Sequence, residues 1–60
     1  MNYDKAVEYF LKAAELGDRR SMAFLTEIYE EGKGVKVDLE KSRYWRKRFD
    51  EANESVPKSE

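Results

Sequence analysis

The segment from Tyr29 to Asp38 constrains the fold of this chain most strongly. It contains two glycines, Gly32 and Gly34, separated by one residue and followed by Val35. Glycine tolerates the left-handed backbone conformation in which helices commonly end, and aspartate is a preferred residue at helix N-termini. The segment therefore predicts the end of one helix, a corner and the start of another helix.

Hydrophobic periodicity on both sides of this corner predicts three helices. Apolar residues recur at three- and four-residue spacing, and the expected helices cover residues 3–16, 19–31 and 39–53. Gly17 is expected to end the first helix and Asp18 to cap the second. This short hinge folds the first two helices into an antiparallel hairpin.

The apolar positions also predict which side of each helix packs. The expected stripe of the second helix is Met22, Leu25, Ile28 and Tyr29, and that of the third is Leu39, Ser42, Trp45, Phe49 and Ala52. The first helix is apolar over more than one stripe, so it needs neighbours on more than one side. Val35 and Val37 are expected to fill the corner, Asn2 to cap the first helix, and Asn53 to end the third in the left-handed conformation.

Residues 1–54 are therefore expected to form one all-α domain of three antiparallel helices, followed by a flexible tail over residues 55–60. A chain of this size buries only about 60% of the surface that its unfolded form exposes, so its stability is marginal. The sequence has no cysteine for a disulfide. Helix packing, self-association or a partner must supply the stability.

Composition argues against several classes of function. The 12 basic residues are balanced by 13 acidic ones, so the chain lacks the overall basic charge of a nucleic-acid-binding domain. No apolar run approaches the roughly 20 residues of a membrane span, and the N-terminus lacks the basic start of a secretory signal. We therefore expect a cytoplasmic protein.

The absence of histidine and cysteine removes the usual general base and nucleophile near neutral pH, together with the usual zinc ligands. Glu27 and Glu31 lie four residues apart, but two carboxylates without further ligands make only a weak cation site. We therefore expect no enzyme, no cofactor and no metal.

The first and third predicted helices correspond when the sequence is shifted by 36 residues. The shift pairs Lys5 with Lys41, Ala6 with Ser42, Tyr9 with Trp45, Glu15 with Glu51 and Gly17 with Asn53. A period in the mid-thirties is typical of stacked helix pairs. The chain is therefore interpreted as half of a helical-hairpin repeat followed by one whole repeat.

These residues resemble the Sel-one-like repeats, relatives of the tetratricopeptide repeat, over residues 2–53. The resemblance rests on Leu25, Tyr29, Gly32, Gly34, Val35, Asp38, Lys41 and Trp45 in one repeat, and on Lys12, Ala13, Ala14 and Gly17 in the preceding one. It implies a fragment of an α-solenoid with a scaffold or adaptor role and no catalysis in the repeat itself.

The third helix departs from this pattern. Phe49 and Asp50 stand where the first helix has the small pair Ala13 and Ala14, so a further repeat could not approach closely. We therefore interpret the third helix as a terminal cap, which repeat arrays need for solubility. The first helix lacks its own hairpin partner, and its open apolar face indicates either truncation of a longer array or completion by another chain.

Phe24 is the main candidate for partner binding. It lies opposite the inward stripe of the second helix, in line with Arg20, Glu27 and Glu31. In the family that the chain resembles, the first helix of each pair lines the concave surface. An exposed aromatic residue flanked by charges is a plausible binding hot spot, and the alternative for Phe24 is burial against a neighbouring helix. Most of the other aromatic residues are expected in the core.

The third helix carries five basic residues between positions 41 and 48. Arg43, Arg46 and Lys47 form a basic face, and we favour a solvated surface with ion pairs such as Arg46 with Asp50. An acidic protein partner is the second interpretation and a nucleic-acid contact the third.

The sequence as a whole predicts a protein–protein interaction module, a small adaptor or inhibitor that binds through the second helix and the open face of the first. Two alternatives remain. One is a structural homodimer in which the first helices of two copies pair. The other is a small binder of nucleic acid or acidic surfaces that uses the basic face.

Overall fold

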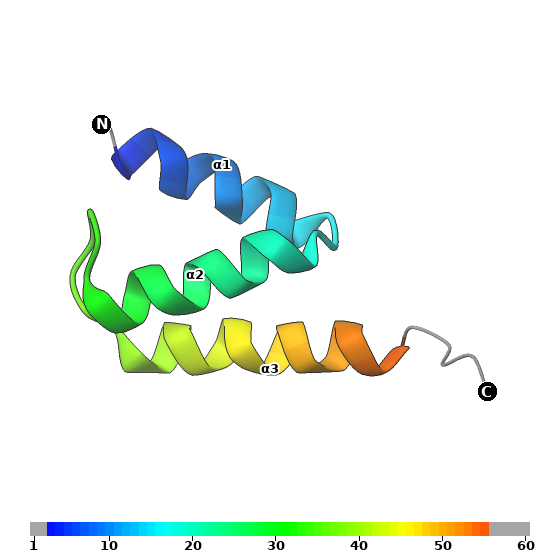
Figure 1. The fold of residues 1–60 in the computed structure, drawn as a ribbon. Coiled ribbons are helices and arrows are strands. Elements are labelled where there is room, and N and C mark those ends of the chain that lie inside the picture. Colours follow the sequence, from blue (N-terminus) through cyan, green and yellow to red (C-terminus); the bar gives the residue numbers. More distant parts are fainter. Residues whose placement is uncertain (1–2, 56–60) are drawn as a thin grey trace.

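The computed structural model describes residues 3–55, with the side chains of residues 3–53. It contains three helices, α1 (Tyr3–Glu15), α2 (Arg19–Glu31) and α3 (Leu39–Ser55). In Figure 1, α2 lies between α1 and α3, and each helix runs antiparallel to the one before it. The predicted all-α fold of three antiparallel helices is confirmed, with no strand among the described residues.

Two helix ends differ from the expected ones. Helix α1 ends at Glu15, because Leu16 and Gly17 already form the turn, in which Gly17 has a φ of 100°. Helix α3 continues to Ser55, so the expected left-handed end at Asn53 is wrong. Nothing before Pro57 forces an end, and the Asn53 side chain accepts a hydrogen bond from Arg19. Asn2 and residues 56–60 of the expected tail lie outside the described residues.

The two hairpin corners begin with the same glycine motif. At the end of α1 the Asp18 N–H donates to the Ala13 carbonyl at 3.0 Å, around Gly17 in a left-handed conformation. At the end of α2 the Lys33 N–H donates to the Ile28 carbonyl at 3.1 Å, again around a left-handed glycine, Gly32. These bonds satisfy carbonyl groups that a helix end otherwise leaves unpaired.

Aspartates begin the following helices. The Asp18 carboxylate accepts the backbone N–H of Arg20 at 3.1 Å and the hydroxyl of Ser21 at 3.2 Å. The Asp38 carboxylate accepts the backbone N–H of Lys41 at 3.1 Å. A side-chain oxygen at this position replaces the missing intrahelical acceptor of the first turn.

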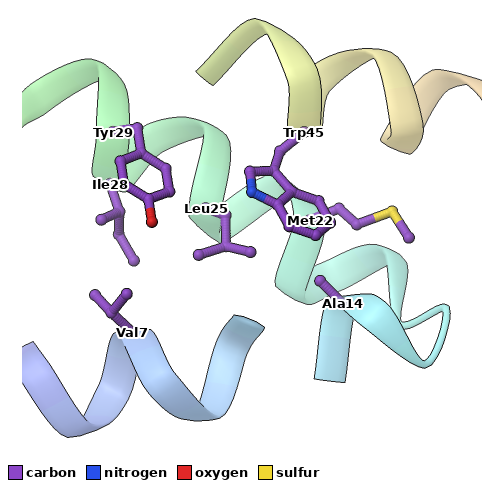
Figure 2. Packing of buried hydrophobic residues seen from close by; sticks show 7 residues of the cluster. All are labelled: Val7, Ala14, Met22, Leu25, Ile28, Tyr29 and Trp45. Atoms are coloured by element: carbon purple, nitrogen blue, oxygen red, sulfur yellow. The ribbon is translucent and has the colours of Figure 1, made fainter. Parts of the chain in front are cut away.

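The core lies on the inward side of α2 and is drawn in Figure 2. Its buried apolar members are Val7, Ala14, Met22, Leu25, Ile28, Tyr29 and Trp45. Leu25 is fully buried at the centre, and Trp45 extends from α3 toward Met22 and the end of α1. Trp45 thus anchors α3 to the core on α2.

Several apolar residues lie outside this core. Leu39, expected to point inward, is 52% exposed because it is the first residue of α3 and lies at the edge of the helix pair. Val37 is also exposed, although its side chain lies against Gly32 in the corner, and Val35 packs against the core. Tyr9 and Tyr44 are exposed because they lie on the sides of α1 and α3 that face away from α2.

The corner between α2 and α3 extends to the start of α1 (Figure 1). A Cβ atom added to Gly34 would lie 2.1 Å from the Cβ of Tyr3, and the Asp38 N–H donates to the Tyr29 carbonyl at 2.9 Å. The corner is therefore held against two helices, and Gly34 is required both for its left-handed backbone and for its lack of a side chain.

Candidate functional site

The outward face of α2 carries a shallow groove of about 350 Å³. It is lined by Arg20, Ala23, Phe24, Thr26, Glu27 and Glu30. The inward stripe of α2 is committed to the core, so these residues form the opposite face of the same helix. The small Ala23 side chain leaves space between the larger neighbouring side chains, and this space is the groove.

Phe24 forms the aromatic wall of the groove and is 48% exposed. Its other side stacks on Phe10 of α1, with ring centroids 4.9 Å apart and an interplanar angle of 26°. Phe10 in turn meets Tyr9 edge to face, at 5.7 Å. Phe24 therefore combines the two expected arrangements, since one side of the ring packs on a neighbouring helix while part of it remains open to solvent.

The charges of the groove are separated along α2. Arg20 lies toward its N-terminal end and Glu27 and Glu30 toward its C-terminal end, and seven residues of helix correspond to about 10 Å. Glu30 was missed by the sequence interpretation, although its seven-residue spacing from Ala23 places it on the same face.

Glu31, which the sequence placed with this group, does not line the groove. Its carboxylate lies 3.2 Å from the ammonium group of Lys33 in the corner after α2. Hydrogen bonding to Glu31, together with the charges of Glu31 and Glu27, raises the pKa of Lys33. Glu31 thus contributes to the helix end rather than to the outward face.

The basic face of α3 is interrupted by acidic groups. Arg43, Arg46 and Lys47 are all exposed. The predicted pair of Arg46 with Asp50 is present, with 3.9 Å between Nε and Oδ2. Arg43 and Arg46 also share a second depression, of about 220 Å³, with Glu30 of α2. The face is therefore a mixed-charge surface.

Arg48 is turned away from this face. Its guanidinium lies over the rings of Tyr44 and Trp45, donates a hydrogen bond to the Tyr44 hydroxyl at 3.2 Å, and approaches Glu15 at 3.7 Å. The hydrogen bond with Tyr44 raises the pKa of Arg48. Arg48 thus links α3 to the end of α1 and is part of the scaffold.

The motif residues identified in the sequence shape the fold. Gly17, Asp18, Gly32, Gly34 and Asp38 form the corners and helix starts, whereas Leu25, Tyr29, Val35 and Trp45 pack in or against the core. Between residues 3 and 53, no three side chains of the metal-binding types His, Cys, Asp and Glu come together. No described helix combines the length and apolar character that crossing a membrane requires.

Comparison with known protein families matches the Sel1 repeat to residues 2–18 and 20–48. Neither a search of curated proteins nor one of solved structures found a match. Sel1 repeats are helical solenoid repeats that generally mediate protein–protein interactions, and proteins built from them are generally not enzymes. The matched segments cover most of the sequence and correspond to the half repeat and the whole repeat, so the chain belongs to the Sel1 repeat family.

Proposed function

We propose that this chain is a small adaptor or inhibitor that binds a partner polypeptide along the outward groove of α2 and on the open side of α1. The strongest support is the environment of Phe24. Its ring is half exposed in the groove, and stacking on Phe10 holds it in place.

This arrangement favours binding for two physical reasons. Aromatic side chains at the centre of a contact surface often carry a large share of the binding energy. A ring already ordered by a neighbour loses little conformational freedom when the partner arrives. Phe24 is therefore the residue on the outward face of α2 whose truncation should weaken binding most.

The charges set the orientation of the partner. A polypeptide with an acidic residue near Arg20 and a basic residue near Glu27 and Glu30 pairs favourably, and the reverse direction places like charges together. Such complementarity contributes to specificity and to the association rate more than to raw affinity. The groove thus favours a partner segment with an apolar residue between an acid and a base.

A displayed library of random peptides provides the test. Peptides selected on the folded chain should bind Phe24→Ala at least about tenfold more weakly, a difference of about 1.4 kcal/mol. Glu27→Lys should weaken those selected peptides that carry a basic residue. Tyr44→Ala is the matched control, because Tyr44 is equally exposed but lies on α3.

Circular dichroism of each variant establishes that its helices persist. If the selected peptides bound Phe24→Ala and Glu27→Lys as tightly as the original chain, the groove would not be the binding surface and the proposal would be wrong.

A further inference from the structure

The side of α1 that faces away from α2 carries an apolar strip. Its members are Ala6, Tyr9 and Ala13 of α1 and Leu16 of the turn that follows, spaced by three and four residues. Tyr9 is 65% exposed and Leu16 is 89% exposed, whereas the two alanines are partly buried. The opposite side of α1 is already used, because Val7 and Ala14 are buried against α2. Helix α1 therefore has two apolar sides, of which α2 covers one.

The internal repeat identifies what covers such a strip. The shift of 36 residues places it on Ser42, Trp45, Phe49 and Ala52 of α3. In that helix the same positions face α2, where Trp45 is only 3% exposed and Phe49 and Ala52 pack against the core. The Ser42 hydroxyl also donates to the Thr26 carbonyl of α2 at 2.9 Å. In the whole repeat, the α3 residues equivalent to the strip are therefore covered by the antiparallel helix α2.

We infer that the strip on α1 is the docking site for an amphipathic helix of a partner protein that lies antiparallel to α1. By analogy with α2, the partner helix presents a large aliphatic residue, a leucine and an aromatic residue at the spacing of Met22, Leu25 and Tyr29. Ala6 and Ala13 are small enough for the partner helix to approach closely. This inference rests on the proposed protein-binding function but uses a different surface from the α2 groove.

Helix α2 of a second copy does not supply that helix. In each folded copy the α2 stripe is already covered, with Met22 2%, Leu25 0% and Tyr29 7% exposed. Releasing the stripe would cost the copy its own core, which holds all three residues. The inferred occupant is therefore a helix whose apolar stripe is free, which α2 of a folded copy does not offer.

The chain itself provides a probe of the required chemistry, namely a synthetic peptide of residues 18–31 with blocked ends. This peptide is added to the isotopically labelled full chain, and backbone amide signals are followed by nuclear magnetic resonance. We expect saturable shifts centred on Ala6, Tyr9, Ala13 and Leu16. A peptide with Leu25→Asp should produce no such shifts, because the charge lies in the middle of its apolar stripe.

Variants of the chain locate the contact. Tyr9→Ala and Leu16→Glu should each weaken peptide binding at least about tenfold, equivalent to about 1.4 kcal/mol. Lys47→Ala should leave it unchanged, since this exposed lysine is on the far helix. Leu16 lies outside α1 and is almost fully exposed, so Leu16→Glu tests the strip without a change in the core.

Three outcomes would overturn the inference. The first is no shift at these residues in a large excess of peptide, and the second is shifts confined to the α2 groove or to the depression that Arg43 and Arg46 share with Glu30. The third is unchanged binding to Leu16→Glu. A concentration-dependent dimer whose contacts map to the strip in the absence of peptide would assign the face to a second copy instead. Peptides selected for the α2 groove should still bind Leu16→Glu, so failure of this inference is distinguishable from failure of the proposed function.

Discussion

At the residue scale, the corner after α2 shows how a single missing side chain links distant parts of the chain. Gly34 and Gly17 both have left-handed backbone conformations, with φ of 76° and 100°. A Cβ added to Gly17 meets nothing within 4 Å, whereas one added to Gly34 overlaps the Cβ of Tyr3. Substitutions at the two glycines therefore separate the free-energy cost of a left-handed side-chain-bearing residue from the cost of a steric clash with Tyr3.

Alanine substitutions at these two positions should differ in effect. Gly17→Ala should lower the free energy of unfolding by about 1–2 kcal/mol, the cost of a left-handed alanine. Gly34→Ala should lower it further, because Tyr3 must also move. Urea unfolding monitored by circular dichroism measures both values, and equal losses would show that the corner does not rest on α1.

The sequence predicted Gly34 as part of a corner but could not predict its contact with Tyr3. Glycine spacing reports local backbone geometry, whereas this contact depends on how the hairpins pack. The same limit applies to Phe24. Its place on the outward face followed from helical periodicity, but its stacking on Phe10 depends on the position of α1 beside α2.

At the element scale, both aspartate caps were predictable because the interaction is local. The Asp18 and Asp38 carboxylates accept backbone N–H groups two and three residues ahead. The end of α3 was not predictable in this way. Asn53 has the residue type of a helix end, yet it remains helical and accepts a hydrogen bond from Arg19.

Loss of either cap should destabilise the fold measurably. Asp38→Ala and Asp18→Ala should each lower the free energy of unfolding by about 1 kcal/mol, the usual cost of removing a capping side chain. Asp38→Asn and Asp18→Asn keep a capping oxygen and should recover most of this loss. Thermal and urea unfolding of the four variants provide the comparison. If the asparagine variants were as unstable as the alanine variants, backbone capping would not be the reason for these residues.

At the scale of the whole molecule, α1 and α3 occupy equivalent places in the repeat but differ in the number of their apolar sides. The residues of α1 in or against the core include Val7, Phe10 and Ala14. The shift of 36 residues places these positions on Arg43, Arg46 and Asp50 of α3, which are exposed and charged. Helix α1 is thus suited to lie between two neighbours, whereas α3 is suited to end an array. This difference supports the proposal that α3 is a terminal cap.

Repeat architecture and the corners were predictable because they depend on periodicity and on residues with special backbone preferences. Helical periodicity placed Arg20, Phe24, Glu27 and Glu31 on one face of α2, but it could not show that Glu30 lines the groove while Glu31 pairs with Lys33. The sequence also could not predict that Arg48 links α3 to the end of α1 while the other basic residues lie on the outward face of α3. This division depends on the position of Glu15 beside α3.

Helix α1 corresponds to the second helix of a hairpin, and we propose that its apolar strip binds a helix equivalent to α2. The most direct test adds a copy of residues 18–38 immediately before Tyr3, which reproduces the spacing that joins α2 to α3. The copy with Leu25→Asp is the matched control. The measurement is the melting temperature by circular dichroism.

We predict that the added segment becomes helical and raises the melting temperature by about 10 °C, since each 1 kcal/mol corresponds to about 4–8 °C in a domain of 60–100 residues. The control extension should give no increase. An added segment that stays unfolded, or one that raises the melting temperature no more than its Leu25→Asp control, would contradict the proposal that α1 binds a helix equivalent to α2.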